Sequence, residues 1–334
     1  MPSTLTLSVL DTSPIVAGSS AKQALHNTLD LARLADTTGY HRYWVPEHHS
    51  MRGVACAEPA VLAGAIAAAT ARLRVGAGGA LLPNHPPLLV AERWGMLTAL
   101  HPGRIDLGIG RASGGAPSVA EALRRPHDAT TASAHAAALT ELLDHFEAEP
   151  EPPQVRAVPA SGNRPDIWLL GSSGASARLA AEHGLPCANA YHLNPDKALD
   201  TAQSYRAAFQ PSAHLPEPTT LVSVAVICAD TDTDAEWLAG STRMKTLSRH
   251  RGHRIQLPSP EHAATELAAL DDAELGTYSP GLVIGSPDTV IRQLRTIATR
   301  TGTTELMITT PVHDHEQRLR SYRLLIEEAG TCPR

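Results

Sequence analysis

Two glycine-rich stretches carry the residues that are best suited to binding an anion. The first, Leu169–Ser176, joins an apolar run of strand character, Asp166–Leu170, to a helical pattern, Ala175–His183. Ser172 and Ser173 are good N-cap residues, and the free N–H groups and positive dipole end of a helix favour a phosphate. Taken alone, this stretch fits an ordinary strand–helix turn with a serine cap equally well, so the second stretch has to decide.

The second stretch, Gly108–Gly115, places Arg111 directly after another apolar strand pattern. Its glycines let a ligand approach the backbone closely, and a guanidinium group binds a phosphate through two parallel hydrogen bonds. The glycine spacing differs from the Rossmann fingerprint, and no helix pattern begins on this loop. If the two strands are neighbours, Arg111 and Ser173 can face the same phosphate. The candidate cofactor-binding residues of the two stretches are Arg111, Ser172, Ser173, Gly174 and Ser176.

A third feature, Glu47-His48-His49, ends a short strand pattern and offers a general base that works near neutral pH. Vicinal histidines point in opposite directions on an extended chain, so at most one faces a site, and we assign that role to His48. A histidine held by loop hydrogen bonds is one alternative. A metal site is a weaker one, because the other close pair, His313 and His315, lacks a set of acidic and histidine partners.

Two further positions complete the candidate set, which contains no metal ligand. Gly78-Gly79 ends a third strand pattern and would let a flat ligand lie against bare backbone, although a simple bulge or turn explains the pair as well. His192 follows the sixth strand pattern and is a candidate substrate contact.

These residues lie on an alternation of strand and helix patterns that is typical of a parallel α/β fold. The expected strands are Thr4–Leu10, Tyr43–Val45, Leu73–Ala77, Ile105–Ile109, Asp166–Leu170, Pro186–Ala190, Leu221–Cys228 and Glu305–Thr309. Helical patterns follow each of the first six strands, cover part of the long stretch after the seventh, and close the chain at Asp314–Glu328. Eight such units predict a (β/α)8 TIM barrel, one domain over residues 1–334, with insertions after strands 4 and 7.

A barrel of this kind places its site at the C-terminal ends of the strands. The residues expected there are His48, Gly78, Gly79, Arg111, Ser173, His192 and Thr309. Two segments, Ala116–Pro165 and Thr231–Leu282, are long enough to cover such a site as a lid or rim.

The composition excludes several functional classes. The net charge of -6 gives no reason to expect nucleic acid or an anionic membrane as a partner. The four cysteines lie far apart without CxxC spacing, so neither a disulfide framework nor a zinc site is indicated. No signal peptide is visible, and no apolar run approaches the roughly 18 residues of a membrane helix. We therefore expect a soluble, cytoplasmic protein that acts on a small molecule.

Four segments together resemble the bacterial luciferase-like flavin monooxygenase family. They are Pro46–His49, Leu82–Pro86, His101–Arg111 and Leu170–Gly174, and the likeness continues to Gly285–Pro287 and Leu306–Thr309, which is nearly the whole chain. The resemblance implies a TIM barrel that binds FMN, with the phosphate held by Arg111, Ser173 and Ser176. It also implies a non-prolyl cis peptide bond under the flavin ring at Gly78-Gly79, and a catalytic role for His48.

Two positions depart from the luciferases themselves. Gly110 stands in place of a cysteine near the flavin, and Ser172 stands in place of an acidic residue. The chain therefore resembles the non-luminescent branch, which includes tailoring oxygenases of bacterial polyketide pathways, of the mensacarcin type, in secondary metabolism. This likeness implies that reduced FMN (FMNH2) and O2 form a C4a-hydroperoxyflavin. That species inserts one oxygen atom into an organic substrate by hydroxylation, epoxidation or Baeyer–Villiger chemistry.

The expected partners follow from the same likeness. The chain has no recognisable NAD(P)H fingerprint, so a two-component oxidoreductase with a separate NAD(P)H:flavin reductase is expected. Two alternatives stay open, namely an F420-dependent hydride-transfer enzyme on the same fold and a flavin-binding protein without catalysis. Relatives of this fold pair through helices beside strands two and three, here Ala21–Thr38, Pro59–Ala71 and Leu88–Leu100, and this predicts a homodimer.

Overall fold

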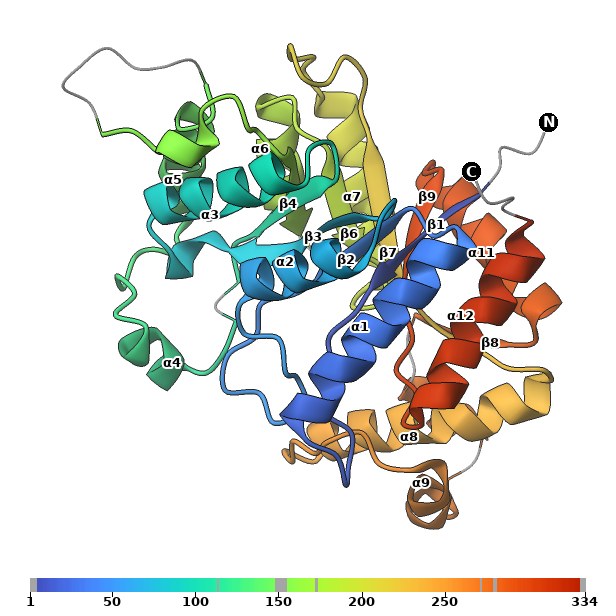
Figure 1. Ribbon diagram of the computed structural model, residues 1–334. Coiled ribbons are helices and arrows are strands. Elements are labelled where there is room, and N and C mark those ends of the chain that lie inside the picture. The colour runs from blue at the N-terminus through green and yellow to red at the C-terminus, as the bar shows by residue number, and fades with distance from the viewer. Residues whose placement is uncertain are drawn as a thin grey trace.

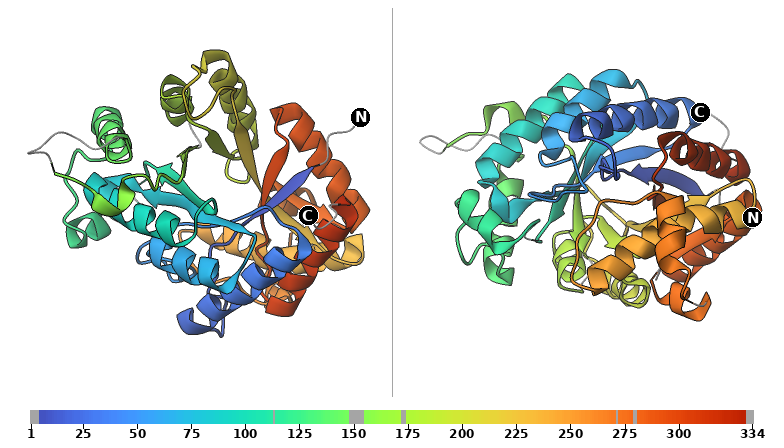
Figure 2. Two further views of the ribbon diagram at one scale, coloured as in Figure 1. Left: turned by 45° about the horizontal axis from the view of Figure 1, so that its top comes forward. Right: turned by 90° about the horizontal axis from the view of Figure 1, so that it is seen from below.

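The computed structural model describes residues 5–112, 114–147, 155–171, 174–270, 272–278 and 281–330. Its strands are β1 (Thr6–Leu10), β2 (Arg42–Val45), β3 (Arg74–Leu81), β4 (Ile105–Gly110), β5 (Asp166–Gly171), β6 (Cys187–Ala190), β7 (Thr220–Cys228), β8 (Leu282–Gly285) and β9 (Glu305–Thr309). Strands β1 to β7 pair in parallel in chain order, and β9 closes the ring by pairing with both β7 and β1. The predicted (β/α)8 barrel of eight strands is therefore confirmed (Figures 1 and 2).

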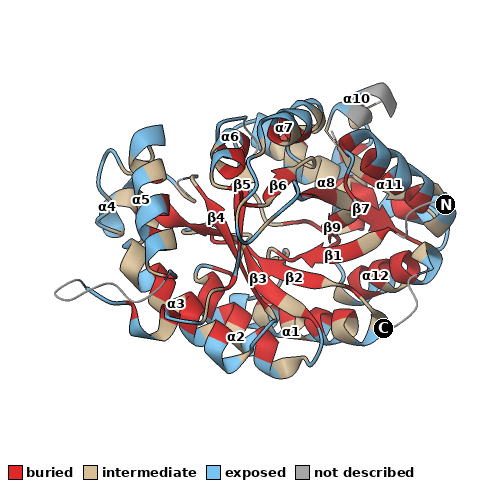
Figure 3. Cartoon of the chain, turned by 90° about the horizontal axis from the view of Figure 1, so that it is seen from above, coloured by how far each residue is buried: buried red, intermediate tan, exposed pale blue. Residues whose placement is uncertain are grey.

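Helices surround the barrel, and most of them bury part of their surface (Figure 3). They are α1 (Ala21–Thr38), α2 (Pro59–Ala69), α3 (Pro87–Leu100), α4 (Pro117–Ala122), α5 (Ala132–Asp144), α6 (Gly174–Glu182), α7 (Pro195–Ala208), α8 (Asp232–His250), α9 (Pro260–Leu267), α10 (Asp272–Thr277), α11 (Pro287–Thr301) and α12 (His315–Ala329). Their ends follow local sequence: the Ser20 side chain accepts the N–H of Gln23 at the start of α1, and Gly39 ends that helix in the left-handed conformation.

The second long insertion is more regular than the sequence predicted. The expectation for Thr231–Leu282 was an irregular stretch with helical pieces, whereas the chain forms α8, α9 and α10 there and then enters an additional strand, β8. β8 pairs with residues 225–228 of β7, beyond residues 220–223, which pair with β6. The sequence hides this strand because Leu282-Val283-Ile284 is a short apolar run, which periodicity cannot distinguish from a helical segment.

The third strand is also longer than predicted. β3 does not end at Ala77 but continues through Gly78-Gly79 to Leu81, with a shift of register against β4 between Gly78 and Ala80. The glycine pair therefore lies inside a strand, at a β-bulge, rather than in the loop after it. A bulge of this kind re-aims the backbone next to a site.

The first insertion keeps the predicted order of a short helix and then a longer one, α4 and α5. Within the described ranges, no helix has both the length and the apolar character that a membrane span requires. The same residues contain no group of three or more His, Cys, Asp or Glu side chains arranged to hold a metal ion. Cys56, Cys187 and Cys228 are buried free thiols.

Candidate active site

A cavity of about 780 Å³ lies at the C-terminal ends of the barrel strands, where the fold predicts a site. Its wall is mainly apolar and contains Leu10, Trp44, Pro46, Leu81, Leu170, Ala188, Ala190, Leu193, Leu221 and Met307. The polar lining residues are Thr12, Glu47, His48, Arg111, Arg125, Thr130, Ser176, Asn189, His192 and Ser223. An apolar wall with a few placed polar groups is typical of a cofactor or small-molecule site.

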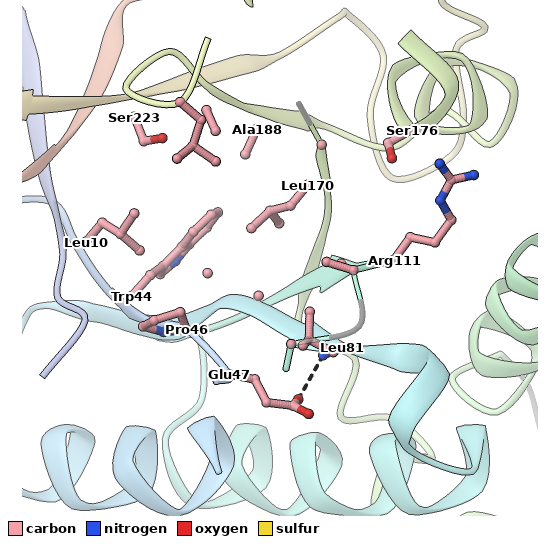
Figure 4. A pocket seen from close by; sticks show the side chains of 18 of the residues that line it. Leu10, Trp44, Pro46, Glu47, Leu81, Arg111, Leu170, Ser176, Ala188 and Ser223 are labelled. Carbon is pink, nitrogen blue, oxygen red and sulfur yellow. Dashed lines mark hydrogen bonds between the residues drawn. The ribbon is translucent and has the colours of Figure 1, made fainter. Parts of the chain in front are cut away.

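Arg111 and Ser176 form a cationic corner on one side of this cavity (Figure 4). Arg111 follows β4, and Ser176 lies in the first turn of α6 after β5. β4 and β5 are paired neighbours, as the sequence analysis expected. Within the described parts of the chain, no carboxylate pairs with Arg111, so its charge can serve a ligand. The positive N-terminal end of α6 adds to the attraction for an anion.

The rest of the predicted phosphate turn is only partly placed. Ser172 and Ser173 lie outside the described residues, so their role stays a prediction. Gly174 begins α6 but is not among the residues that line the cavity. Thr309, also expected at this face, does not line the cavity either, and its neighbour Met307 does.

Sequence reasoning missed two further cavity residues, Arg125 and Thr130. Arg125 lies just after α4, and its Nη1 donates to Oδ1 of Asn84 at 3.1 Å. The available signal was weak: a basic pair, Arg124-Arg125, inside the first insertion. Lone basic pairs are common on protein surfaces, so this one did not point to the barrel mouth.

His135, on α5, is a second group near the cationic corner that the sequence did not reveal. Its side chain is buried, and burial together with the charge of Arg111 lowers its pKa to about 4. At neutral pH His135 is therefore uncharged, and the positive charge of the cationic corner belongs to Arg111.

The floor of the cavity contains the bare backbone of Gly78 and Gly79, which are joined by a cis peptide bond. Neither position has room for a side chain. A Cβ atom on Gly78 would lie 2.8 Å from Cδ1 of Leu10, and one on Gly79 would lie 2.8 Å from the carbonyl oxygen of Gly108. Glycine is thus required at both positions by close packing, and the cis bond lies where the family resemblance placed it.

Trp44 forms a rigid wall next to this floor. Its Nε1 donates to Oδ2 of the fully buried Asp106 at 2.8 Å, and Arg42 donates to the same oxygen at 2.9 Å. The Trp44 ring meets that of Trp168 edge to face, with 5.5 Å between ring centroids. Because its polar end is hydrogen-bonded and its ring is packed, Trp44 offers an apolar surface in a fixed orientation.

The carboxylate of Glu47 links the ends of β2 and β3. Its side chain is fully buried and accepts hydrogen bonds from four groups: His49 Nε2 at 2.8 Å, Leu81 N at 2.8 Å, Asn84 Nδ2 at 2.9 Å and His85 Nε2 at 3.0 Å. Its backbone N–H also donates to the carbonyl oxygen of Gly79 at 3.2 Å. Burial alone would raise the pKa of Glu47, but the hydrogen bonds from His85, Asn84 and Leu81 outweigh it and lower the pKa. An ionised Glu47 therefore holds the glycine floor and the following turn in place.

His48 faces the cavity, whereas His49 turns to Glu47, as the alternation of vicinal side chains predicted. The backbone N–H of His48 donates to the carbonyl oxygen of Cys56 at 3.1 Å. Burial lowers the pKa of His48 below 6.5, and the neighbouring Glu47 charge opposes this only in part. His48 is therefore neutral at pH 7 and able to accept a proton. Its Nδ1 is buried and has no hydrogen-bond partner in the described chain.

His192 lies across the cavity in the turn between β6 and α7, and its Nδ1 is 3.0 Å from Oγ of Ser223 on β7. Burial lowers its pKa, so this imidazole is neutral as well. The structure therefore brings His48, Gly78, Gly79, Arg111, Ser176 and His192 to one cavity.

The cavity can hold a flavin mononucleotide. The cationic corner suits a phosphate, the bare Gly78-Gly79 backbone leaves space for a flat ring, and Trp44 and Leu170 provide apolar surface on either side of that floor (Figure 4). The volume of about 780 Å³ leaves room for a second, small molecule beside the ring.

Comparisons with known proteins give a consistent result. Residues 5–305 match the family model described as luciferase-like monooxygenase. The chain is 41% identical over 325 residues to a luciferase-like monooxygenase of Escherichia coli K12, covering 97% of each chain. It is similar to the crystal structure of apo-MsnO8, with a TM-score of 0.93, 38% identity and full coverage of both chains. The fold alone is shared with an oxygenating 3,6-diketocamphane monooxygenase component from Pseudomonas putida in complex with FMN. That likeness has a TM-score of 0.76 at 22% identity and covers 99% of this chain and 100% of that one.

Proposed function

The chain belongs to the luciferase-like monooxygenase family, and from this premise we propose that it uses reduced FMN and O2 to oxygenate a small organic substrate. One observation carries the proposal: a cationic corner, a side-chain-free floor and a neutral histidine surround a single cavity. When bound, the reduced flavin supplies the electrons that activate O2. The protein supplies binding, orientation and exclusion of water.

Arg111 and Ser176, with Ser172, Ser173 and the start of α6, hold the phosphate in this proposal. Arg111 supplies charge-assisted hydrogen bonds, and the helix dipole adds a further attraction for the anion. Gly78 and Gly79 support the ring from below, and the fixed side chain of Trp44 limits its position. The camphane monooxygenase component of the same fold is a complex with FMN, which supports a flavin as the cofactor in this proposal.

His48 acts on protons rather than on the phosphate. It faces the cavity beside the glycine floor, and its lowered pKa keeps it neutral at pH 7, so Nε2 can accept a proton from the substrate or donate a hydrogen bond to it. Both carboxylate oxygens of the ionised Glu47 are hydrogen-bonded within the protein, so neither is free to contact a ligand in the cavity. We therefore assign Glu47 a positioning role and His48 a catalytic one.

The test supplies reduced FMN through an independent NAD(P)H:flavin reductase and follows a panel of organic compounds under isotopically labelled O2. We expect one labelled oxygen atom in the product and consumption of O2 that depends on the compound. Hydride transfer with F420 and no incorporation of label would instead establish the F420-dependent alternative. Tight flavin binding without conversion of any compound would favour a non-catalytic flavin protein.

We also propose a homodimer that pairs through α1, α2 and α3. Large apolar side chains are exposed on two of these helices: Val61 (72%) on α2, and Leu89 (41%), Met96 (53%) and Leu100 (69%) on α3. Such a concentration of exposed apolar surface is typical of an interface. A reductase that delivers reduced FMN remains a separate partner in this proposal.

A further inference from the structure

We propose that His192 recognises a hydroxyl group, so that the substrates of this site are apolar molecules that carry an O–H group. The inference deepens the proposed function and rests on it for the position of the cofactor. The observations concern the tautomer of His192, its place at the rim and the side chains around it.

The hydrogen bonds of His192 fix which ring nitrogen carries the proton. Nδ1 lies 3.3 Å from the carbonyl oxygen of Ser223, which can only accept, and 3.0 Å from its Oγ. The Ser223 hydroxyl in turn donates to the carbonyl oxygen of Asn189 at 3.3 Å, which leaves its lone pairs for the imidazole. Nδ1 is therefore the protonated nitrogen, and Nε2 carries a lone pair.

Nε2 needs a donor that the described protein does not provide. Its ring lines the cavity, and no hydrogen bond to Nε2 occurs within the part of the chain that the structure describes. Because burial keeps this imidazole neutral at pH 7, Nε2 remains an acceptor there. A ligand binds more tightly when its O–H donates to a partly buried acceptor, and less tightly when it covers that acceptor without donating a hydrogen bond.

The side chains near His192 are mainly apolar and lie away from the cationic corner. Leu193, the next residue, lines the cavity although it is 63% exposed, so an apolar surface borders the entrance. Figure 4 shows Ser223, Ala188 and Leu10 grouped on the opposite side of the cavity from Arg111 and Ser176. A ligand at this end therefore meets apolar surface, the acceptor Nε2 of His192 and the polar side chain of Asn189, whose Nδ2 has no hydrogen-bond partner within the described chain and can donate to a hydroxyl oxygen.

The position of His192 favours the substrate over the cofactor as its donor. The residue stands in the turn beyond the end of β6, beside the exposed Leu193, whereas Gly78-Gly79 lies within β3. A molecule that enters from solvent meets this rim before it reaches the floor. The N3–H of a flavin ring is the competing donor, and the experiment below separates the two.

The test measures binding rather than turnover. The protein is saturated with oxidised FMN and titrated calorimetrically with 2-naphthol and with its methyl ether, 2-methoxynaphthalene, which has the same rings but no O–H. We expect the wild-type protein to bind 2-naphthol about tenfold more tightly than the ether. His192→Leu should bind the two within twofold of each other, and His192→Gln, whose amide oxygen can accept, should keep a preference of at least about threefold. His253→Gln, an exposed histidine outside the cavity, is the matched control and should behave as wild type.

Every outcome bears on the inference. If His192→Leu keeps the tenfold preference, if it loses FMN affinity to the same extent as naphthol affinity, or if wild type binds neither naphthalene, the inference is wrong. Near-ultraviolet circular dichroism checks the fold, and His192→Met replaces the leucine variant if that one is unfolded. Failure of the proposed function looks different: the naphthol preference persists, but no labelled oxygen enters any compound.

Discussion

Replacing Glu47 with glutamine tests whether the buried carboxylate organises the floor of the cavity. The change keeps the shape of the side chain and removes one charge. It also exchanges an acceptor oxygen for an NH2 group, which can only donate. The native carboxylate has donors at both oxygens, so at the Oε2 position the new NH2 group meets a backbone N–H, and at the Oε1 position it meets an amide donor and two imidazoles that can accept only after a change of tautomer.

The cost can be worked from these contacts. At the Oε2 position the NH2 group faces the backbone N–H of Leu81, which cannot become an acceptor. At the Oε1 position it faces the Nδ2 of Asn84, whose Oδ1 is already engaged by Arg125. A charge-assisted hydrogen bond is lost, and either a buried donor is left unsatisfied or His49 or His85 must change its tautomer to accept from the NH2 group, which together cost about 2–4 kcal/mol. The Glu47 pKa is lowered in the folded protein, so its stabilisation is present above about pH 4.5 and is lost as the pH falls further.

Thermal unfolding at pH 7 is the assay, with FMN affinity as a second readout. We expect Glu47→Gln to melt roughly 3–6 °C below wild type and to bind FMN several-fold more weakly, because Glu47 N–H also holds the Gly79 carbonyl. The control is Asp288→Asn, which removes the same charge from a side chain that is 83% exposed and 3.2 Å from Arg292. That change should shift stability by no more than about 0.5 kcal/mol. A Glu47→Gln protein that melts and binds FMN as the control does would refute the reasoning.

Four further predictions follow. Arg111→Ala should weaken FMN binding by roughly one to two orders of magnitude in a fluorescence titration, and an unchanged Kd would exclude this phosphate site. His48→Ala should lower product formation about 10²–10⁴-fold with FMN affinity within a few-fold, and wild-type activity should fall as the pH drops below 6.5, since His48 must be neutral. Light scattering should return twice the mass of one chain for wild type and a single-chain mass for the double variant Val61→Glu, Leu100→Glu. Between pH 6.5 and about 4, His135 is protonated only in the unfolded state, so wild type should lose at most about 3 kcal/mol of stability as the pH falls through this range. His135→Gln should not show this loss. Identical stability–pH curves would show that His135 does not titrate in this way.

The barrel and the face that carries its cavity could be predicted because both follow from local patterns. Alternating strand and helix periods define eight units, and parallel strands that close into a ring bring their C-terminal ends to one face. His48, Arg111 and His192 could be placed there from their position relative to a strand end alone, whereas Ser176 came with the family resemblance. The cis bond at Gly78-Gly79 came instead from the family resemblance, since no rule of composition or spacing identifies it.

The remaining features depend on contacts between distant residues. Three of the four donors around Glu47 come from the end of the neighbouring strand β3 and the turn after it, and a buried glutamate after a strand gives no sign of them in sequence. Arg125 lines the cavity and His135 lies near Arg111 because parts of the first insertion pack beside the barrel mouth, and no local pattern shows that packing. β8 was missed for a different reason. Its apolar run is so short that periodicity cannot distinguish a strand from a helical segment.

The two sides of the cavity differ in how firmly they are held, and this bears on how the site can change. On the β2–β4 side, Glu47 and its donors tie His48, the glycine floor and the following turn together, so a substitution there disturbs several groups at once. On the β6–β7 side, His192 depends mainly on Ser223, and Leu193 is largely exposed. A residue with few partners can be replaced at small cost in stability, because little else depends on it. Changes of substrate should therefore arise at His192 and Leu193, whereas the residues proposed to hold the cofactor tolerate little change.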